Sequence, residues 1–469
     1  MSADRSVLFR QVRVRGALTE VLVLEGRIHL VGAGVGPERG TEVEVVHGEG
    51  GELLPGLHDH HVHLAATAAA MASVEVGPPR VTTVEQFARA LGDAALGPGN
   101  EWIRAVGYHE SVAGPLDREL LDRLVPDRPV RVQDRSGVRW TLNSTGLEAV
   151  RAADARHPGI ARDHRGRPTG PIDRGDDWLR DAIGSSFPDL THLGRRLAAL
   201  GVTGVTDCTP YTDDSGPAAL AAAVASGALP QSVHVTGGIE LVDRTAPAPL
   251  HQGPVKLVLD EVDLPDLVDL SGRIVAAHEA RRPVAVHAVT AATLAFALAA
   301  WDQAGVRTGD RVEHGSVISP AAGERLARLG LTVVTQPAFV AERGDEYLSE
   351  VPLDEVPDLY RCATLHALGV PMAAGSDAPY TDPDPWAAIR AATDRRTPTG
   401  VVLGADERVT PDRALGLYLG DPLDPGRRSR TVAVGHPADL VLLDRPWSGS
   451  GTPPTADAVR ASFREGVRI

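Results

Sequence analysis

From about Gly51 onward the chain repeats one pattern, in which a short apolar segment ends in polar residues and an amphipathic segment follows. This rhythm is typical of βα units that build a parallel sheet. A closed (β/α)8 TIM barrel needs eight such strands, and an α/β barrel is therefore the predicted fold. The predicted strands are Leu53–His63, Val130–Asp134, Val202–Thr206, Pro254–Leu259, Pro283–His287, Arg311–His314, Leu331–Gln336 and Val370–Asp377.

The two ends of the chain carry a different pattern, in which short apolar runs alternate with turns. Toward the C-terminus this pattern predicts strands at Thr431–Ala433 and Ala438–Asp444. The segment 65–188 is too long for one crossover connection, and it is predicted to be an insertion that caps the barrel mouth. The predicted domains are a small composite β-sandwich of residues 1–54 and 410–469 and a barrel of residues 55–409.

Composition and charge narrow the location and the partners of the protein. The N-terminus carries Asp4, Arg5 and Arg10, which leaves no apolar centre for a secretory signal, so a cytoplasmic protein is expected. Two cysteines in such a chain, Cys208 and Cys362, predict reduced thiols. A formal charge of -15 argues against broad contact with nucleic-acid phosphates. We expect a small-molecule substrate, no nucleic acid and no membrane, while assembly into a homo-oligomer stays open.

Lys256 is the only lysine among 47 basic residues, and all the others are arginines. A codon bias toward arginine explains the scarcity of lysine but not the lysine that remains. A site that needs an amine able to lose its proton cannot use a guanidinium, which stays protonated. Lys256 is therefore a candidate functional residue, although a chance survivor is the simpler alternative.

The segment LHDHHVHL at the end of the first predicted barrel strand is rich in histidine. Residues two apart on a strand share a face, so Asp59, His61 and His63 are expected to point the same way. Two imidazoles at this spacing, at the carboxyl end of a barrel strand, can hold one cation from the same side. His58 and His60 fall on the opposite face and are predicted to be structural, while Asp59 is predicted to orient a ligand rather than to bind metal.

Four further polar residues end apolar strands at positions where a nonpolar residue is the default. Each would lie at the carboxyl rim of the barrel, and one such residue alone is weak evidence, because strands often end in polar residues. Together with the two histidines of the first strand, they predict a metal centre. They are Lys256, His287, His314 and Asp377.

The motifs PGLHDHHVHL, VKLVLDE, VHAV, RVEHGS and GSDAP together resemble the successive motifs of the amidohydrolase superfamily. The chain is most similar to its YtcJ-like, N-substituted formamide deformylase-like branch, amidohydrolase family 3, over nearly its whole length. The resemblance implies a distorted TIM barrel with a composite β-sandwich. It also implies one or two divalent ions, zinc or a similar metal, and a carboxylated lysine that bridges two metals.

On this resemblance, His61, His63 and Asp377 hold the more buried ion, His287 and His314 hold the outer one, and carboxylated Lys256 bridges them. Asp377 also acts as the general base toward a metal-activated hydroxide and then as the acid toward the leaving amine. A glutamine at the end of the next strand, Gln336, is predicted to contact the substrate.

One departure from the family concerns substrate recognition. Where the branch commonly has Ser-Gly-His, this chain has Ser136, Gly137 and Val138. If the family histidine touches the substrate, valine removes a hydrogen bond and makes that wall apolar. Inference of the substrate from relatives is weakened accordingly, whereas all the metal-ligand positions match.

The predicted function is hydrolysis of a C–N bond, in an amide, N-formyl or N-acyl group of a small molecule, by a metal-activated hydroxide. A cyclic amide hydrolase or a deaminase would use the same centre. A catalytically silent metal-binding barrel is the alternative of another class, and retention of the complete ligand set with Asp377 argues against it.

Overall fold

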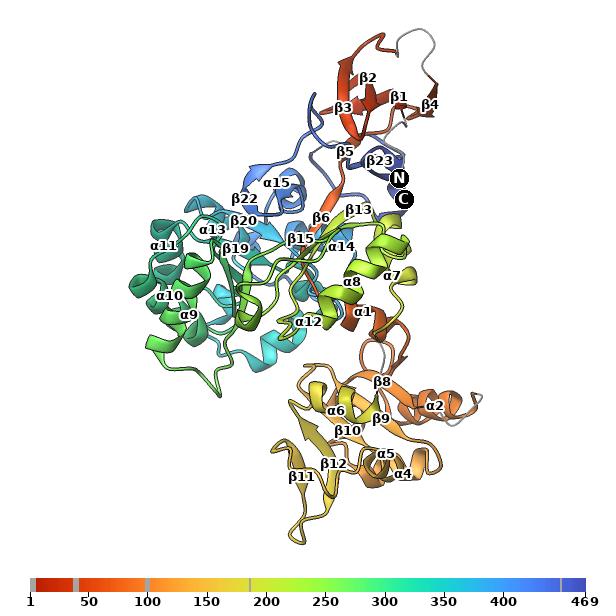
Figure 1. The fold of residues 1–469 in the computed structure, drawn as a ribbon, viewed down its shortest axis with the longest axis vertical. Helices are drawn as coiled ribbons and strands as arrows, with labels where there is room; N and C mark the ends of the chain where they lie inside the picture. The colour runs from red at the N-terminus through yellow and green to blue at the C-terminus, as the bar shows by residue number, and fades with distance from the viewer. Residues whose placement is uncertain (1–5, 37–41, 98–101, 185–186, 448) are drawn as a thin grey trace. The chain divides into compact units, whose positions relative to one another are not determined.

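The computed structural model describes residues 6–36, 42–97, 102–184, 187–447 and 449–469 (Figure 1). Contacts divide the chain into two compact units. One unit comprises Met1–Leu64 and Asp189–Ile469, and the other comprises Ala65–Pro188. No helix in the described part of the chain is long and apolar enough to cross a membrane.

The two ends of the chain meet in two small sheets that share one hydrophobic core. Phe9 and Phe463 pack edge to face there, with ring centroids 4.9 Å apart. The predicted strand at Thr431–Ala433 is wrong, since the strand of this region comes earlier, at β22 (Asp424–Ser429). The first sheet has the order β3 (Arg27–Gly32), β2 (Ala17–Leu24), β1 (Ser6–Val14) and β4 (Val43–His47), and the second has the order β25 (Val467–Arg468), β24 (Val459–Arg464), β23 (Leu440–Leu443) and β5 (Leu53–Pro55).

The strands that carry the predicted site lie in two parallel sheets (Figure 1). Helices follow most of these strands, as the repeated βα pattern predicts. The four-stranded sheet has the order β15 (His251–Gln252), β14 (Ser232–Val235), β13 (Val202–Asp207) and β6 (Leu57–Val62). The five-stranded sheet has the order β16 (Val255–Val258), β17 (Val284–Ala288), β18 (Arg311–His314), β19 (Thr332–Thr335) and β20 (Met372–Ala374).

No strand ladder joins these two sheets within the described residues, so hydrogen-bonded strands do not complete the predicted closed ring. Backbone hydrogen bonds outside any strand ladder bridge both gaps instead. The Lys256 N–H donates to the Gly237 carbonyl at 2.8 Å, and the Asp377 N–H donates to the His61 carbonyl at 2.7 Å. Both bridges involve residues of the predicted site, so the sheets come together where the site residues lie.

Two strand assignments in the predicted ring are corrected. Val130–Asp134 forms β9, which belongs to the sheet of the other unit, and its alternation of apolar and polar residues suits a half-exposed sheet. Ser232–Val235 forms the missing parallel strand, which is short and contains a histidine. The predicted strand Leu53–His63 is divided at Gly56, where a Cβ atom would lie 2.2 Å from the Thr203 hydroxyl.

Alternation along the five-stranded sheet separates its core face from its polar face. Leu257, Val286, Val312 and Val333 join a large cluster of buried apolar residues. Lys256, His287 and Glu313 occupy the positions between them, and therefore project to the other face. The helices α9 (Leu267–Glu279), α10 (Ala291–Ala304) and α11 (Pro320–Leu329) contribute residues to the apolar cluster.

The unit Ala65–Pro188 contains a mixed six-stranded sheet. One face packs on α2 (Val84–Ala95) and α4 (Arg118–Leu124) through Phe87, Leu91 and Leu121. Its role as a cap over the parallel sheets stays a prediction. The sheet has the order β11 (Ile160–Arg162), β12 (Pro168–Asp173), β10 (Arg139–Leu142), β9, β8 (Ile103–Tyr108) and β7 (Val74–Glu75).

Candidate metal centre

The side chain of Asp377 lies among three histidines. Its Oδ1 atom is 3.4 Å from Nε2 of His61 and 3.3 Å from Nε2 of His63. Its Oδ2 atom is 3.8 Å from Nδ1 of His314. His61, His314 and Asp377 are all buried, and their potential ligand atoms lie close enough together to hold one metal ion. Residues from β6, β18 and the end of β20 thus meet at one point.

The remaining two residues of the predicted set lie beside this group. Lys256 is buried, and its Nζ atom is 3.5 Å from Nε2 of His61. The ring centroid of His287 is 4.5 Å from that of His314. The structure therefore brings together all six predicted metal residues, which we call the six-residue cluster: His61, His63, Lys256, His287, His314 and Asp377. Their roles as ligands stay predictions.

Two residues of the cluster adopt a backbone conformation that is unusual for residues other than glycine. His314 has a φ of 71° and Asp377 has a φ of 55°, both in the left-handed region. Each follows or ends a parallel strand of the same sheet. Left-handed residues of this kind cost free energy that the surrounding structure must supply, and they are concentrated at functional sites.

Burial favours the neutral, metal-binding form of three histidines of the cluster, His61, His287 and His314. Burial, with the positive charge of Lys256 as a smaller cause, lowers the pKa of His287 to about 3. The pKa values of His61 and His314 are also lowered well below their usual value, again mainly by burial. A neutral imidazole has one nitrogen lone pair free to bind a cation, so these shifts favour metal binding at neutral pH.

Asp59 lies beside the cluster and hydrogen-bonds to the segments that carry it, in agreement with the prediction that it orients a ligand. Its Oδ1 accepts hydrogen bonds from the backbone N–H groups of His61, at 3.1 Å, and Ser376, at 3.0 Å. Its Oδ2 accepts the Ser376 hydroxyl at 2.6 Å. Burial raises the pKa of Asp59 to about 6, against the lowering effect of these hydrogen bonds. Asp59 therefore links β6 to the segment that carries Asp377.

The two other histidines of the first strand are buried but remain outside the cluster. His58 Nε2 lies 2.9 Å from the hydroxyl of Thr206, and the ring of His60 packs on that of His58 with centroids 4.6 Å apart. Neither belongs to a group of described side chains that is close enough to hold an ion.

Sequence reasoning gave no role to Glu313, which turns out to contact the cluster directly. Its Oε2 atom lies 2.5 Å from Nδ1 of His61, and both side chains are fully buried. Its Oε1 accepts a hydrogen bond from Nε of buried Arg311 at 2.6 Å. Charged residues two apart in a short buried strand were a signal in the sequence, since burying charge is costly unless it has a function or a partner.

Gln336 was predicted to contact the substrate, but its side chain is fully buried. Its Oε1 lies 3.0 Å from Nδ1 of His314, and its Nε2 donates to the Val334 carbonyl at 3.2 Å. Its visible contacts are therefore with a cluster histidine and the backbone, and substrate contact stays a prediction. Ser136 and Val138, which depart from the family pattern, lie in the turn between β9 and β10, where Val138 is exposed.

Asp377 provides a test of whether a metal ion fits. Its Oδ1 atom is buried and makes no hydrogen bond, although Nε2 atoms of two histidines lie within 3.4 Å. A buried carboxylate oxygen without a hydrogen bond is unfavourable unless a cation compensates it, and Nε2 of His61, whose pKa burial lowers well below its usual value, could share that cation. Nitrogen and carboxylate ligands of this type suit zinc and related divalent ions. The residues present therefore fit a divalent metal.

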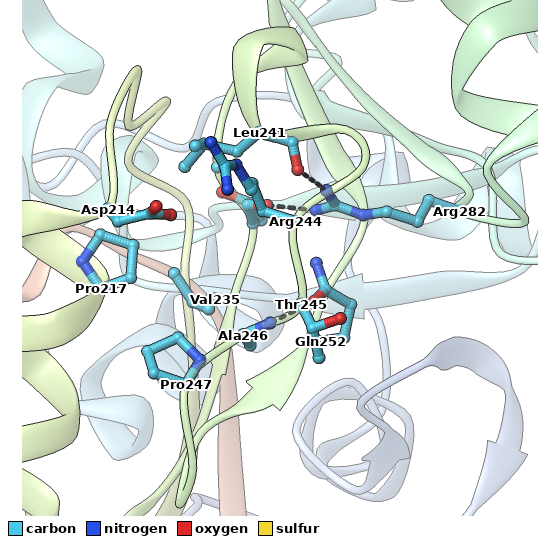
Figure 2. Close-up of a pocket in the computed structure, with 12 residues that line it drawn as sticks. Asp214, Pro217, Val235, Leu241, Arg244, Thr245, Ala246, Pro247, Gln252 and Arg282 are labelled. Atoms are coloured by element: carbon cyan, nitrogen blue, oxygen red, sulfur yellow. Dashed lines mark hydrogen bonds between the residues drawn. The ribbon is translucent and has the colours of Figure 1, made fainter.

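A separate hollow is lined by Asp214, Arg244, Gln252 and Arg282 among others (Figure 2). The Arg282 guanidinium donates to the backbone carbonyls of Leu241, at 2.8 Å, and Gly253, at 3.2 Å. Its charge is thus used to hold loops together. None of the six cluster residues lines this hollow.

Several known proteins and solved structures are similar to this chain. It is 25% identical to N-substituted formamide deformylase from Arthrobacter pascens, over 93% of this chain and 92% of that protein. It is 27% identical to the putative amidohydrolase YtcJ of Bacillus subtilis, over 86% and 85%. An uncharacterised metal-dependent hydrolase from Pyrococcus furiosus has the same fold, with a TM-score of 0.73 and 21% identity over 94% of this chain and 99% of that one.

A family model spans most of the chain. The model of amidohydrolase family 3 matches residues 44–466. That range includes both parallel sheets, the six-residue cluster and, of the terminal strands, β5, β23, β24 and most of β4. The resemblance inferred from the motifs is confirmed, and the chain belongs to the amidohydrolase family.

Proposed function

We propose that this protein hydrolyses a C–N bond in an amide, N-formyl or N-acyl group of a small molecule, and that it does so with one or two divalent ions. The observation that carries the proposal is the convergence of the six-residue cluster around a buried carboxylate oxygen that has no hydrogen-bond partner. The two parallel sheets that hold the cluster are, on this proposal, a distorted (β/α)8 barrel whose carboxyl rim forms the active site.

The six residues would divide between two ion positions. His61, His63 and Asp377 would hold one ion, and His287 and His314 would hold the other. Lys256 would bridge them after carboxylation, in which the neutral amine adds to carbon dioxide, forms a carbamate and releases a proton. A carbamate is an anion with two oxygens, and arginine cannot form it, which accounts for the single lysine of the chain.

A divalent ion in this position supplies two effects: it lowers the pKa of a bound water and it polarises the carbonyl of the substrate. The chain's own contribution is the movement of a proton. Asp377 would accept a proton from the attacking water on its carboxylate, which has one oxygen to face the ion and a second to take the proton. It would then deliver that proton to the departing nitrogen, so that amide and water give a carboxylic acid and an amine.

The similarity to N-substituted formamide deformylase supports N-formyl amines as the first substrates to examine. Because Val138 departs from the family pattern, inference of the substrate from relatives is weaker, and N-acyl amines are tested beside the formyl amines. A cyclic amide hydrolase or a deaminase would share the cluster, and a fold match to an adenosine deaminase from Xanthomonas campestris, with a TM-score of 0.53 and 16% identity, keeps that alternative in the test.

The experiment begins with protein stripped of metal by a chelator and reloaded with zinc, manganese or no metal. A panel of N-formyl amines, N-acyl amines, cyclic amides and aminopurines is then assayed for release of amine, acid or ammonia. Turnover of a formyl or acyl amine that needs reloaded metal supports the proposal. Turnover of a cyclic amide or an aminopurine selects the alternative reaction. Absence of turnover across the panel in a protein that binds metal would favour the catalytically silent barrel.

A further inference from the structure

A buried ionic network lies directly beside the cluster and is not part of it. Arg311 and Glu313 are two residues apart in β18, on the face opposite to the apolar cluster that contains Val312. Both side chains are at most 1% exposed. Burying two charges costs several kcal/mol per ion unless hydrogen bonds and opposite charges compensate. A barrel interior filled by apolar side chains would avoid this cost, so the pair needs an explanation.

The contacts of His61 explain why this charged pair is buried here. Its Nδ1 atom lies 2.5 Å from Oε2 of Glu313, and its Nε2 atom faces Asp377 and Lys256. A carboxylate accepts hydrogen bonds and cannot donate them, so the proton of this contact resides on the imidazole side, at Nδ1. In the neutral ring the lone pair is then at Nε2, on the side of the cluster. One contact thereby sets both the tautomer and the orientation of the ring.

Arg311 hydrogen-bonds to the second oxygen of the Glu313 carboxylate. Its Nε donates to Oε1 of Glu313 at 2.6 Å, and its Nη2 lies 3.4 Å from the His60 carbonyl and 3.7 Å from Sγ of Cys208. His61, Cys208 and Glu313 could by distance alone hold a cation. The guanidinium already provides a positive charge at that position, which argues for a supporting network there rather than a second metal site.

The three contacted histidines differ in the partner of Nδ1. Glu313, a carboxylate, lies beside His61, whereas the side-chain amide of Gln336 lies 3.0 Å from Nδ1 of His314. For His63, the hydroxyl of Thr209 lies 3.4 Å from Nδ1. The shortest of these three contacts belongs to His61, whose Nε2 atom also lies 3.5 Å from Nζ of Lys256. The contact with Glu313 therefore holds the ring of His61 in one orientation.

We propose that Glu313 is a positioning residue, which fixes the Nδ1–H tautomer of His61 so that Nε2 binds metal, and that Arg311 holds Glu313 in place. This inference rests on the proposed metal-dependent function. It predicts that Glu313 controls metal affinity without touching the ion or the substrate. Carboxylate partners of ligand histidines typically change metal affinity by about 10- to 100-fold when they are removed.

The test compares zinc affinity in metal-free proteins, measured by competition with a chromogenic chelator. Glu313→Gln keeps the shape of the side chain but cannot accept from both His61 and Arg311, because one of its two terminal atoms is a donor. We expect its zinc Kd to rise by about 10- to 100-fold. Glu407→Gln is the matched control, since Glu407 is a buried glutamate paired with Arg361 at 3.3 Å outside the cluster. Its zinc Kd should equal that of the wild type.

A second variant guards against misfolding of the first. Glu313→Asp keeps the negative charge beside Arg311, but its carboxylate is one methylene too short to contact both partners. It should therefore show a zinc Kd between those of the wild type and Glu313→Gln. An unchanged Kd in either folded Glu313 variant overturns the inference. A wild-type protein that binds no zinc, manganese or cobalt overturns the proposed function itself, so the two failures are distinguishable.

Discussion

Oδ1 of Asp377 lies 3.3 Å from Nε2 of His63, yet it is buried and makes no hydrogen bond. His63 and Asp377 follow β6 and β20, which lie far apart in the chain, and they meet because the Asp377 N–H donates to the carbonyl of His61. On the proposed function, the Asp377 carboxylate would receive a proton from water at an ion bound among these residues. The following predictions depend on this arrangement and on its surroundings.

Asp377→Asn should lower kcat by about 100- to 10,000-fold, because an amide oxygen cannot take up and return a proton. Metal content should be largely kept, since the amide oxygen can still face the ion. Metal analysis and single-substrate kinetics on the same preparation measure both. Asp384→Asn makes the same chemical change at the N-cap of α14 (Pro385–Asp394), where asparagine caps as well as aspartate, and should remain active. Full activity of Asp377→Asn would refute the assigned role.

Lys256→Arg should lose activity and bind fewer ions per chain, although the positive charge is conserved. A guanidinium cannot form a carbamate, and it is larger than the buried ammonium it replaces. Incubation of the wild type with ¹³C-labelled bicarbonate and zinc should give a carbamate signal by NMR that is absent from the variant. Normal rates and normal metal content in Lys256→Arg would show that the lysine is not carboxylated.

Gln336→Leu separates two roles for the glutamine. If Gln336 orients His314, as its 3.0 Å contact indicates, zinc affinity should fall while KM for small substrates changes little. If it contacts the substrate, KM should rise with zinc affinity unchanged. Chelator competition and steady-state kinetics, run in saturating zinc, distinguish the two. An effect on neither quantity would remove Gln336 from the site.

The stability of the metal-free protein should fall as the pH is lowered from 7.5 to 5.5. Burial, then the nearby His251 and two arginines, lowers the pKa of His234 to about 3, whereas the unfolded state takes up a proton near pH 6.5. The unfolded state therefore binds more protons in this window, so acid favours unfolding. A histidine of this kind lowers the free energy of unfolding by about 1.4 kcal/mol when the pH falls by these two units.

Urea unfolding of the metal-free wild type and His234→Asn at both pH values measures this contribution. The loss of stability on acidification should be smaller in the variant by about 1.4 kcal/mol. Asp59 acts in the opposite sense in both proteins, because its pKa is raised to about 6, and it cancels in the comparison. An equal loss in both proteins would show that His234 is protonated in the folded state.

Local patterns in the sequence were sufficient to predict which residues lie together in the candidate site. The two-residue spacing of His61 and His63, the single lysine and the polar ends of several strands identified six residues that the structure brings together. The pattern was sufficient because a parallel strand places its last residues at one rim, whatever the rest of the chain does. The same reasoning assigned Asp59 to a supporting role, which its three hydrogen bonds confirm.

Pairing between distant strands was not visible in the same patterns. Val130–Asp134 looks like a barrel strand in isolation and lies in another sheet, while Ser232–Val235 looks too short and too polar and lies between β13 and β15 of a parallel sheet. Which strand pairs with which depends on contacts between residues far apart in the chain, and one sequence window does not contain them.

The sequence by itself determined the family, the βα architecture and the residue types that can bind a metal, because these follow from local periodicity and from side-chain chemistry. Only the tertiary structure decided how these residues are supported. Glu313 reaches His61 across a separation of 252 residues. Such a contact is fixed by the packing of the sheets and by the need to compensate buried charge. The residues next to Glu313 or His61 in the sequence reveal neither of these two causes.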